Sequence, residues 1–414
     1  MATKQAALFA FVGCLVLGLF ALASFCNGQN PHYLATADVP EGFCAVTWAS
    51  GLRRPRAIRF ASNGDAIVIE SDESRIQGLN HGLVIDEKNG YIYASTSREV
   101  WRWHYSPGQR SNLGTAAKVI YGIPCCGHLT RTLEMDDEGN LYVSVGSLKN
   151  VDMDDKSAMI RRFINPAAYT TSHQWDDGEI WARGMRNEVG IRFDYSNPRR
   201  LWGVENGVDN VQRVDMGDVH NDNPSEEVNI FDKPGAFYGY PSEYNLKGSR
   251  LGPNVRPGHT RGTQWLHPTF IRDTRFRWAH TAPMDIVFYN GTGFPASWRG
   301  DAFISLHGSW NRPSPVGYNV VRLVMNKTTG LPEEELPFFS PKEGGSSKNK
   351  RHDGHESDEG EDPYPPVPGS WDIRPVSLDF GPCGASNECL FLTSDKNGLI
   401  VAVAYNGVAG EAKR

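Results

Sequence analysis

Short apolar segments separated by polar turns recur along the chain. In Leu141–Val145, apolar side chains alternate with Tyr142 and Ser144, and this period of two is typical of a half-buried β-strand. The segment Leu133–Met135 before it is also strand-like, and the turn at 136–140 is rich in Asp, Asn and Gly, which favour tight turns. The pattern therefore predicts two antiparallel strands joined by a short turn.

The same arrangement of strand, polar turn and strand is repeated along the sequence. Further copies are found at residues 58–69, 83–94, 191–204, 286–306 and 376–394. One such unit cannot bury its own apolar face, so several must pack together. Because there is little helical periodicity between the copies, they indicate a radial all-β array, which is a β-propeller. Their spacing is uneven and does not fix the number of blades.

The composition agrees with a protein of strands and turns. The chain has 414 residues, with 43 Gly, 26 Pro and 11% aromatic residues. A propeller of this length is a single closed unit, and we expect it to span residues 29–410. The net charge of −6 gives no basic surface for a nucleic acid, so nucleic acid is not an expected partner.

Residues 1–28 have the layout of a secretory signal peptide. Lys4 precedes an apolar run at 6–23, and small and polar residues follow it, so cleavage is expected after Ala23 or Gly28. We therefore expect a secreted protein. The run is close to the lower limit of about 18 residues for a membrane span. A retained signal anchor is the alternative, and only then would the protein contact a membrane.

Cysteine usage agrees with export. Cys14 and Cys26 lie in the signal segment, and we expect both to leave with it. Cys383 and Cys389 flank a short turn, so they are expected to form a disulfide across a hairpin.

The adjacent Cys125 and Cys126 have two alternatives. They pair with each other, or one of them pairs with Cys44 and leaves a free thiol, and the sequence does not choose between the two. Asn290 and Asn326 each begin an N-x-T triplet, which is an acceptor site for an N-glycan in an exported chain.

A charged segment at 341–369 does not belong to the propeller core. It contains almost no aliphatic residues, so it cannot bury enough surface to offset its ordering entropy, and we predict a disordered surface loop. His352 and His355 lie among acidic residues there. They are weak metal ligands at most, and a solvated run of charge is the simpler interpretation.

His128 is the first candidate for chemistry. It precedes the strand Leu133–Met135, in a loop that a propeller presents near its central channel. A histidine titrates at about pH 6.5 and suits proton removal near neutrality. The alternative is a structural histidine that is bonded to a neighbouring loop carbonyl.

Two further loops carry groups that could hold an anion and a cation. Arg186 and Asn187 precede another strand, where the arginine fork suits a carboxylate or a quinone oxygen. The alternative is a salt bridge between blades. Gly207 and Val208 follow the strand at 201–204, and a glycine turn can direct backbone carbonyls to a hard cation such as calcium. The alternative is an ordinary hairpin turn.

The segments 277–283 and 306–312 combine aromatic residues with His and Arg at strand ends. They contain Trp278, His280 and His307. Such residues can stack on a flat ligand and hold its charged edge. The alternative is packing between blades.

Taken together and in order, these segments resemble the glucose/sorbosone dehydrogenase family, particularly its sorbosone-dehydrogenase-like branch. The motifs are GHLTRTLEMDDEGNLYVSVGSLKNV, ARGMRNEVGIRFD, DNPSEEVN with AFYGYP, HTAPMDIVFY, and DAFISLHGSWNR with GYNVVRL. The resemblance covers residues 51–403 apart from the charged loop. The ordered series is specific, although each motif alone is not.

The resemblance implies a six-bladed β-propeller that binds pyrroloquinoline quinone (PQQ) and calcium at the top of its central channel. By motif position, His128 matches the family's catalytic base. Arg186 and Asn187 match the pair that holds the cofactor, with Arg186 in a catalytic position near the reacting quinone oxygen. Gly207 and Val208 fall where two backbone carbonyls bind the cofactor's calcium.

The remaining cofactor positions follow from the same resemblance. Asn80 matches a polar residue beside the base, and Trp278 and His280 align with residues of the pocket. His307 aligns with a lysine that contacts the cofactor, and Arg374 with an arginine that pairs with its carboxylates.

The sequence departs from the family pattern at three positions. His307 replaces a fixed positive charge with one that depends on pH. Asp372 stands where a second cofactor-binding arginine is expected, and Ser147 where the glucose-oxidising members have an acidic residue. These changes bear on the affinity for the cofactor.

The sequence therefore predicts an exported PQQ-dependent dehydrogenase that oxidises a sugar, a related polyol or an aldehyde, and passes electrons to an external acceptor. In such an enzyme hydride passes to the quinone while the histidine takes the hydroxyl proton. One alternative is a calcium-dependent hydrolase of the lactonase type, which needs several side-chain carboxylates around the metal. The other is a non-catalytic extracellular propeller that binds a partner.

Overall fold

The computed structural model describes most of the chain as β-strands. The described residues are 9–12, 26, 30–71, 78–196, 199–210, 212–213, 217–218, 220–222, 226–241, 263–265, 279–342, 367, 369–384 and 387–407. Most of the predicted signal segment 1–28 and of the predicted charged loop 341–369 lies outside these residues. Both therefore remain predictions.

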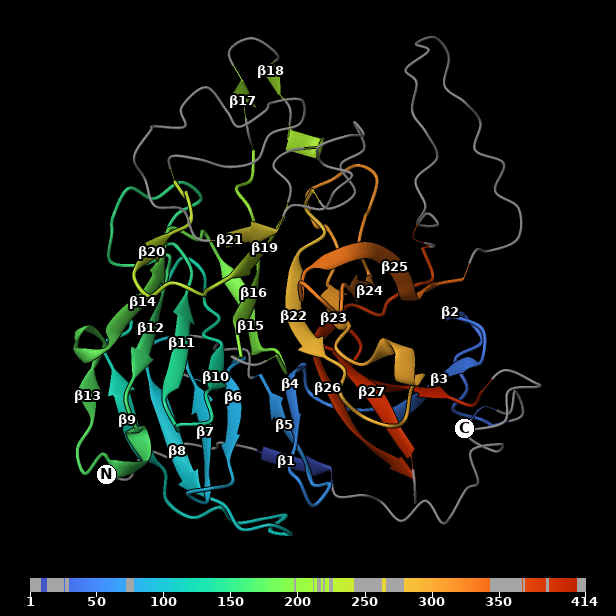
Figure 1. The fold of residues 1–414 in the computed structure, drawn as a ribbon, viewed down its shortest axis with the longest axis horizontal. Coiled ribbons are helices and arrows are strands. Elements are labelled where there is room, and N and C mark those ends of the chain that lie inside the picture. Colours follow the sequence, from blue (N-terminus) through green and yellow to red (C-terminus); the bar gives the residue numbers. More distant parts are fainter. Residues whose placement is uncertain are drawn as a thin grey trace.

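Five sheets of four or five strands form the blades of a β-propeller (Figure 1). The first blade contains β6 (Leu83–Asp86), β7 (Tyr91–Ser95), β8 (Val100–His104), β9 (Ala117–Tyr121) and β13 (His173–Gln174). The second contains β10 (Leu133–Met135), β11 (Leu141–Val145), β12 (Met159–Phe163), β14 (Glu179–Arg183) and β20 (Ala236–Phe237). The third contains β15 (Glu188–Phe193), β16 (Leu201–Glu205), β19 (Glu227–Ile230) and β21 (Thr263–Trp265).

The last two blades complete the right-hand side of Figure 1. The fourth contains β22 (Pro283–Phe288), β23 (Ala302–Leu306), β24 (Asn319–Met325), β25 (Pro332–Pro341) and β2 (Ala37–Asp38). The fifth contains β26 (Pro375–Gly384), β27 (Asn387–Ser394), β28 (Leu399–Tyr405) and β3 (Phe43–Ala49). Because β3 pairs with β28 from the other end of the chain, the early and late parts of the sequence share one blade.

The remaining elements are small. A three-stranded sheet contains β1 (Phe9–Val12), β5 (Ala66–Glu70) and β4 (Pro55–Phe60), and a two-stranded sheet contains β17 (Gln212–Arg213) and β18 (Gly217–Asp218). The helices of the described residues are 3-10 turns: η1 (Pro166–Ala168), η2 (Trp175–Asp177), η3 (His220–Asp222) and η4 (Ala296–Trp298). None of the described helices is long and apolar enough to cross a bilayer.

The prediction of six blades is corrected by the sheet count. The described residues form five blades, and the sheet of β4 and β5 lies between β6 and β26 in the ring (Figure 1). The physical reason is chain length. β5 ends at Glu70 and β6 begins at Leu83, so the connection is too short to supply the two outer strands of a full blade. The all-β propeller itself is confirmed.

The strand pair around the 136–140 turn is confirmed. Leu133 lies opposite Val143 in the antiparallel register of β10 and β11. Asp136 Oδ1 accepts hydrogen bonds from the backbone N–H groups of Glu138 (3.1 Å) and Asn140 (2.8 Å). Gly139 has a φ of 89°, which an L side chain disfavours. Asp136 and Gly139, which predicted a turn from the sequence, are therefore residues that form it.

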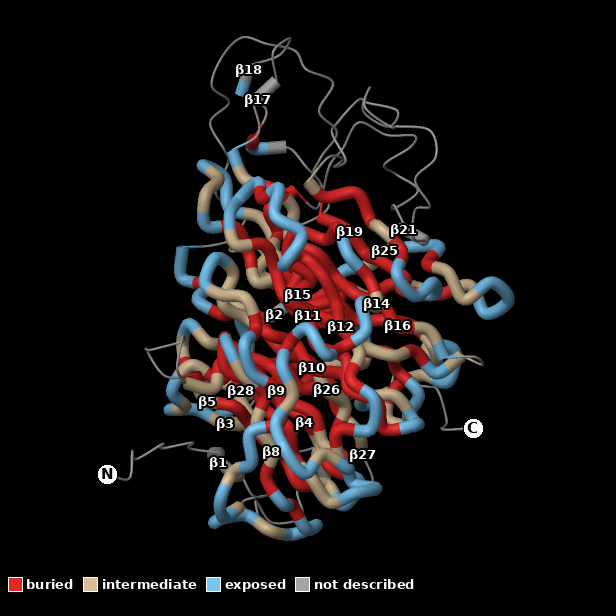
Figure 2. Tube along the Cα trace, turned by 90° about the vertical axis from the view of Figure 1, so that its left-hand side faces the viewer, coloured by how far each residue is buried: buried red, intermediate tan, exposed pale blue. Residues whose placement is uncertain are grey.

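The prediction that Leu141–Val145 is a half-buried strand is wrong. All five residues of β11 are buried, including Tyr142 and Ser144, which were expected to face solvent. A blade is covered on both faces by its neighbours, and Figure 2 shows the central strands buried throughout. The alternation of apolar and polar residues therefore marks a strand here without marking an exposed face.

The structure settles the cysteine pairing. Cys26 is bonded to Cys44, Cys125 to Cys126, and Cys383 to Cys389. The hairpin pair is confirmed, and the adjacent cysteines pair with each other. The expectation that Cys26 leaves with the signal is wrong, because this residue holds the strand β3 through Cys44. Of the two cleavage points considered, only cleavage after Ala23 retains it.

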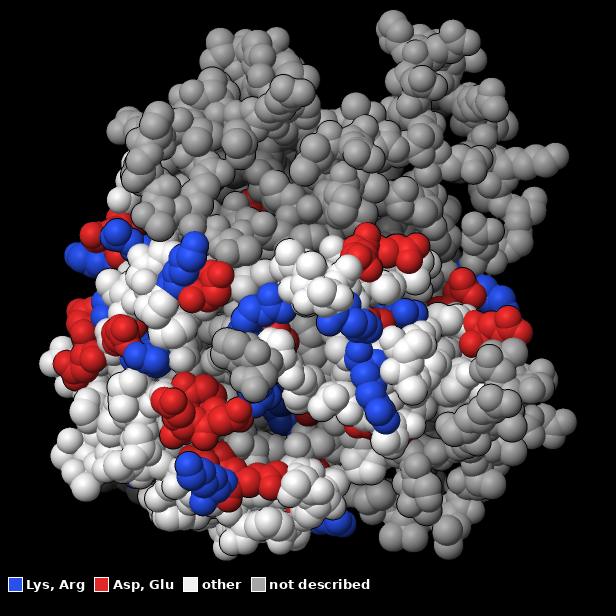
Figure 3. Space-filling view, in the orientation of Figure 1, with Lys and Arg blue, Asp and Glu red and all other residues white. Residues whose placement is uncertain are grey.

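Charged side chains from the inner strands of the ring meet at its axis. Arg59 on β4 lies 3.4 Å from Asp285 on β22. Arg192 on β15 lies 3.5 Å from Glu134, 3.7 Å from Asp285 and 3.9 Å from Asp379. The axis is thus filled with paired charges, and we call these five residues the axial network. By contrast, Lys and Arg are interspersed with Asp and Glu on the outer face seen in Figure 3.

We predict that the contact between the fifth blade and the three-stranded sheet depends on Phe391. Its ring is fully buried and lies 5.0 Å from Trp48 on β3 and 4.6 Å from Phe60 on β4. Phe391→Ala should lower the free energy of unfolding by about 3–5 kcal/mol, measured by urea denaturation. The control Tyr195→Ala alters a ring that is 53% exposed and should leave stability nearly unchanged. Equal stability of the two variants would contradict this packing.

Candidate functional site

The predicted site residues lie in loops at one edge of the propeller. In each antiparallel blade, the loop before the innermost strand and the loop after the next strand lie at the same end. Asn80, His128, Arg186 and Arg374 precede innermost strands, and Gly207 follows β16. The sequence folds these distant loops onto one edge because every blade repeats the same strand order.

The protonation state of His128 follows from its hydrogen bond. Its Nδ1 lies 2.8 Å from the carbonyl oxygen of Ser147, and its own backbone N–H donates to the same oxygen at 3.2 Å. A carbonyl oxygen only accepts, so Nδ1 carries the proton and Nε2 presents a lone pair. The half-buried ring is therefore oriented as a proton acceptor. The alternative of a histidine bonded to a loop carbonyl describes the same contact without excluding the chemical role.

The environment keeps His128 neutral. Burial lowers the pKa of its imidazole, the positive charge of Arg186 lowers it further, and the pKa falls to about 4. Both causes disfavour the imidazolium form. At neutral pH the Nε2 lone pair is therefore free.

Arg186 is held rigidly by the chain around it. Its guanidinium donates to the backbone carbonyl of Asn150 (3.1 Å) and to the side-chain oxygen of the same residue (2.9 Å). It also contacts Asp209 Oδ2 at 3.0 Å, and its backbone N–H donates to Glu205 at 2.5 Å. Because Arg186 is only 6% exposed, these contacts fix its position at the site.

Asn187 is brought against His128 by a glycine. A Cβ atom on Gly146 would lie 2.4 Å from Asn187 Oδ1 and 2.8 Å from His128 Cβ. Only a residue without a side chain allows this approach. The structure thus brings together His128, Arg186 and Asn187.

Three buried glutamates lie in the third blade, and one of them, Glu205, accepts the backbone N–H of Arg186. Glu188, Glu205 and Glu227 lie on adjacent strands of the third blade, and Asn229 donates to Glu188 and Glu205 at 3.1 Å each. Burial raises the pKa of Glu205 to about 7 and, together with the charge of Glu205, raises the pKa of Glu188. Burial therefore favours the protonated forms of Glu188 and Glu205. Only the fold places Glu188 beside Glu205, so sequence spacing gave no signal for these two.

The Gly207–Val208 turn is braced by a buried carboxyl group. Glu226 accepts from the backbone N–H of Gly207 at 2.6 Å and from that of Ala282 at 3.3 Å. Burial raises the pKa of Glu226 to about 8. Within the described part of the chain, neither the carbonyl of Gly207 nor that of Val208 accepts a hydrogen bond. Both carbonyls are therefore available to a cation.

His280 lies next to this turn, whereas Trp278 lies outside the described residues. Asp209, His220 and His280 form a group whose ligand atoms lie within 4.8 Å of one another. Nitrogen ligands suit transition metals, while calcium prefers oxygen. His220 already accepts from the N–H of Asn210 (2.9 Å) and contacts the carbonyl of Asn311 (3.2 Å). Both ring nitrogens are thus engaged by the chain.

Asn80 supports the loop that carries His128. It is buried, and its Nδ2 donates to the carbonyl of Leu129 at 2.7 Å and to Ser97 at 2.8 Å. The residue therefore lies beside the predicted base, as expected, but its amide donors contact the loop itself.

His307 provides no positive charge at neutral pH. Its Nε2 donates to Asp395 at 2.9 Å, and Asp395 also pairs with Arg56 at 2.8 Å. Burial lowers the pKa of His307 in spite of this partner. Among the described acidic side chains, Asp395 is the one that pairs with Arg56.

Arg374 is the second cation of the site. Its guanidinium donates to the carbonyls of His307 (2.9 Å) and Gly308 (2.5 Å), and none of the described acidic side chains pairs with it. Asp372, two residues earlier, is exposed and accepts from Asn397 at 3.1 Å. The structure therefore brings Arg374 and His307 together and leaves Asp372 aside.

Comparison with other proteins adds a family match. The sequence matches the TrAA12-like family model over residues 71–406. It is 28% identical over 346 residues to the pyrroloquinoline quinone-dependent pyranose dehydrogenase of Coprinopsis cinerea, covering 72% of this chain and 46% of that protein. It is 29% identical over 356 residues to the pyrroloquinoline quinone-dependent sugar dehydrogenase of Hypocrea jecorina (strain QM6a), covering 71% and 80%. The chain thus spans about half the length of the Coprinopsis relative.

Solved structures share the fold. The calcium structure of the Trichoderma reesei enzyme of carbohydrate-active family AA12 has a TM-score of 0.67 and 25% identity, and the match covers 89% of this chain and 97% of that one. The holo PQQ domain of the Coprinopsis cinerea pyranose dehydrogenase has a TM-score of 0.70 and 22% identity, with 92% and 99% covered. The resemblance that the motifs indicated is confirmed at the level of the family.

We predict that Asp395 stabilises the protein by balancing Arg56. Burial would raise the pKa of Asp395, but the hydrogen bond from His307 and the charge of Arg56 hold it well below its usual range. Asp395→Asn leaves Arg56 buried and unpaired, and should cost about 3–5 kcal/mol in the free energy of unfolding at pH 7.

The pH dependence has a definite sign. A carboxyl whose pKa is depressed by folding stabilises the protein above its unfolded pKa of about 3.9, and this contribution is lost as the pH falls through the folded value. The difference between Asp395→Asn and wild type should therefore shrink from pH 7 to pH 3 in urea titrations. Asp372→Asn is the exposed control. A difference that grows towards pH 3 would rule out the assignment.

Proposed function

The chain belongs to the TrAA12-like family, and from this premise we propose that it is a quinoprotein dehydrogenase that oxidises a sugar with PQQ and calcium. The observation that supports this most directly is the state of His128. Its Nδ1 proton is held by Ser147 and its Nε2 is free to accept a proton at neutral pH. The relatives named above are PQQ-dependent enzymes acting on pyranoses or other sugars.

The residues at the site fit an anionic quinone with a cation. The carbonyls of Gly207 and Val208 supply two oxygen ligands without competing hydrogen bonds in the described chain, which suits calcium. Arg374 has carbonyl partners and no described acidic partner, so its charge can balance a carboxylate of the cofactor. Asn187 and His280 would lie against the bound cofactor.

When bound, PQQ is a two-electron oxidant whose carbonyls are polarised by calcium. The protein's part is to bind the sugar with the reacting hydroxyl at His128 Nε2, which accepts the hydroxyl proton as the carbon–hydrogen bond is broken. Arg186 places a fixed positive charge beside this centre, and Asn150 and Asp209 prevent it from moving. The carbonyl of Ser147 keeps the Nδ1 proton in place, so Nε2 remains the acceptor.

The physiological setting belongs to the same proposal. Three disulfides are typical of proteins in oxidising compartments, so we propose that the protein is exported. An external electron acceptor would then complete the reaction. The substrate is a sugar or a related polyol.

We predict that His128→Ala abolishes oxidation while the cofactor still binds. The purified protein is reconstituted with PQQ and calcium, and dye reduction is followed across a panel of sugars. Loss of the general base should reduce kcat by about 10²- to 10⁴-fold, while the absorbance of bound PQQ is retained. The matched control is His104→Ala, which removes an exposed histidine at the end of β8.

The same experiment separates the alternatives. Cofactor uptake without turnover on any sugar would favour a non-catalytic propeller. Calcium-dependent lactone hydrolysis without PQQ binding would favour a lactonase. Wild-type turnover in His128→Ala would refute the role of His128.

We also predict the pH dependence of the wild-type enzyme. Because burial and Arg186 lower the pKa of His128 to about 4, the neutral base predominates down to that pH. The value of kcat/KM should therefore stay level from pH 7 to about pH 5 and fall as the pH drops through about 4. An acidic limb at the ordinary histidine value of about 6.5 would show that the base is not in this environment.

A further inference from the structure

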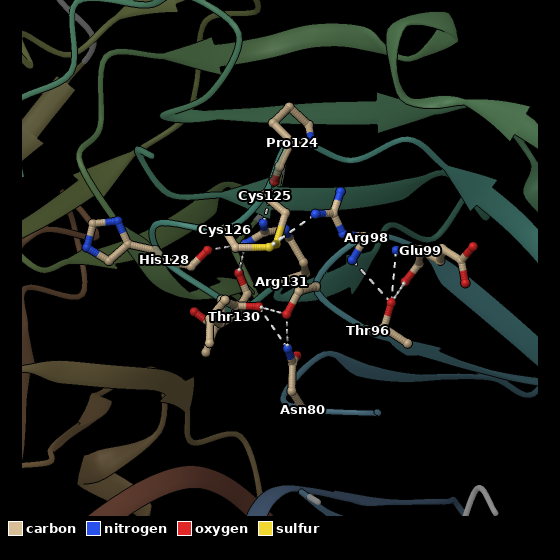
Figure 4. Close-up of a disulfide and its surroundings, with 12 residues drawn as sticks. Asn80, Thr96, Arg98, Glu99, Pro124, Cys125, Cys126, His128, Thr130 and Arg131 are labelled. Carbon is tan, nitrogen blue, oxygen red and sulfur yellow. Dashed lines mark hydrogen bonds between the residues drawn. A yellow bond between two sulfur atoms is a disulfide. The ribbon is translucent and has the colours of Figure 1, made fainter. Parts of the chain in front are cut away.

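The Cys125–Cys126 disulfide lies in the β9–β10 connection and is separated from His128 by Gly127 alone. Cys126 and Gly127 are exposed, and Cys125 is half-buried. Figure 4 shows the sulfur atoms between His128 and Arg98, with the imidazole directed away from them. The disulfide therefore does not face the reacting nitrogen, and any influence on His128 must pass through the backbone.

The backbone on both sides of the disulfide is held by one buried arginine. Arg131 is fully buried and donates to the carbonyls of Pro124 (2.5 Å), His128 (2.9 Å) and Thr130 (2.6 Å). These contacts bracket the segment that contains the disulfide and His128 (Figure 4). The segment is thus pinned at its two ends.

The residues after His128 and the residues before it make different contacts. After His128, the carbonyl of Leu129 accepts from Asn80 (2.7 Å) and Ser97 (2.8 Å). Before His128, Gly127 packs so closely that a Cβ would lie 2.2 Å from the carbonyl of Leu148. The close approach of Gly127 to Leu148 places the segment beside Ser147, whose carbonyl accepts the hydrogen bond from His128. The Cys125–Cys126 disulfide directly precedes this close contact in the chain.

We propose that the Cys125–Cys126 disulfide, together with Arg131, positions His128 against Ser147, so that opening the disulfide lowers turnover. The inference rests on the proposed function for its effect on catalysis, but not for its effect on His128 itself. Cys125, Cys126 and Arg131 are positioning residues.

A dithiol reductant can reduce the Cys125–Cys126 disulfide. A reductant thiolate attacks a sulfur of the disulfide, and its second thiol then displaces the mixed disulfide. Two cysteine thiols form, the reductant becomes a disulfide, and two electrons and two protons are transferred. Arg98 Nη2 lies 3.5 Å from Cys126 Sγ, and a neighbouring guanidinium stabilises a thiolate. Exposed Cys126 is therefore the cysteine that should react first with an alkylating reagent.

The first test is independent of the cofactor. The Cε1–H resonance of His128, assigned with His128→Gln, is titrated by NMR in the wild type and in Cys125→Ser/Cys126→Ser. The groups facing the ring are Arg186, Arg131 and Asp209, with the carbonyl of Ser147. If the imidazole of His128 moves away from Ser147, it loses its burial and the influence of Arg186. The midpoint of its titration should then rise from about pH 4 towards 6.5. The same midpoint in both proteins would overturn the inference.

The second test measures catalysis on the reconstituted enzyme. Cys125→Ser/Cys126→Ser should lower kcat about 10- to 100-fold, as expected when a catalytic group loses its alignment, with PQQ uptake unchanged. The matched control Cys383→Ser/Cys389→Ser opens the hairpin disulfide between β26 and β27 and should leave kcat unchanged. Equal kcat in both double variants would overturn the inference, as would equal losses in both.

The third arm uses the natural chain, in case the double variant folds poorly. Wild type is treated with dithiothreitol, alkylated and desalted, and labelled cysteines are located by peptide mass spectrometry. Loss of activity in step with labelling at Cys126 supports the inference, and full activity after labelling overturns it. If untreated wild type shows no oxidation at all, the proposed function fails, while the NMR titration still decides the role of the disulfide.

Discussion

The axial network is the constraint on which the arrangement of the inner strands depends. Its five members come from different innermost strands, so the charges find their partners only when the ring is closed. Removing one partner from such a buried set leaves an unpaired charge, which costs about 3–5 kcal/mol. The order of the sheets around the ring is thus enforced by electrostatics as well as by apolar packing.

The network also adjusts its own charge. Two arginines face three carboxyl groups, and burial raises the pKa values of Glu134 and Asp379 in spite of Arg192. Asp285 differs, because Arg59 and Arg192 outweigh its burial and lower its pKa. Burial thus opposes the charged form of Glu134 and Asp379, whereas the two arginines favour the charged form of Asp285.

The sequence predicted what depends on neighbouring residues and missed what depends on closure of the ring. The strand pair at 133–145 was predicted correctly, because its alternation and its Asp-Gly-Asn turn are local. The burial of Tyr142 was not, because the blade that covers it is distant in the chain. The pH-dependent charge of His307 was expected, but the sequence did not reveal its burial or its partner Asp395, which is 88 positions away. The motif order still identified His128, Arg186 and Asn187 as neighbours.

The departures from the family pattern have different consequences at the site. Ser147 replaces an acidic side chain, yet His128 is oriented by the backbone carbonyl of Ser147, which any residue supplies. His307 and Asp372, by contrast, do not supply the positive charges of the family pattern. Burial lowers the pKa of the His307 imidazole and favours its neutral form, and Asp372 is an exposed acidic residue. Among the described residues, an anionic ligand at the proposed site would therefore rely on Arg374, on a cation at Gly207 and Val208, and on Arg186. Since Arg186 is already paired with Asp209, Arg374 is the cation of these two that is not yet balanced by a described carboxylate. The affinity for an anionic cofactor should thus depend more on Arg374 than on Arg186, whose main effect is on the neighbouring imidazole.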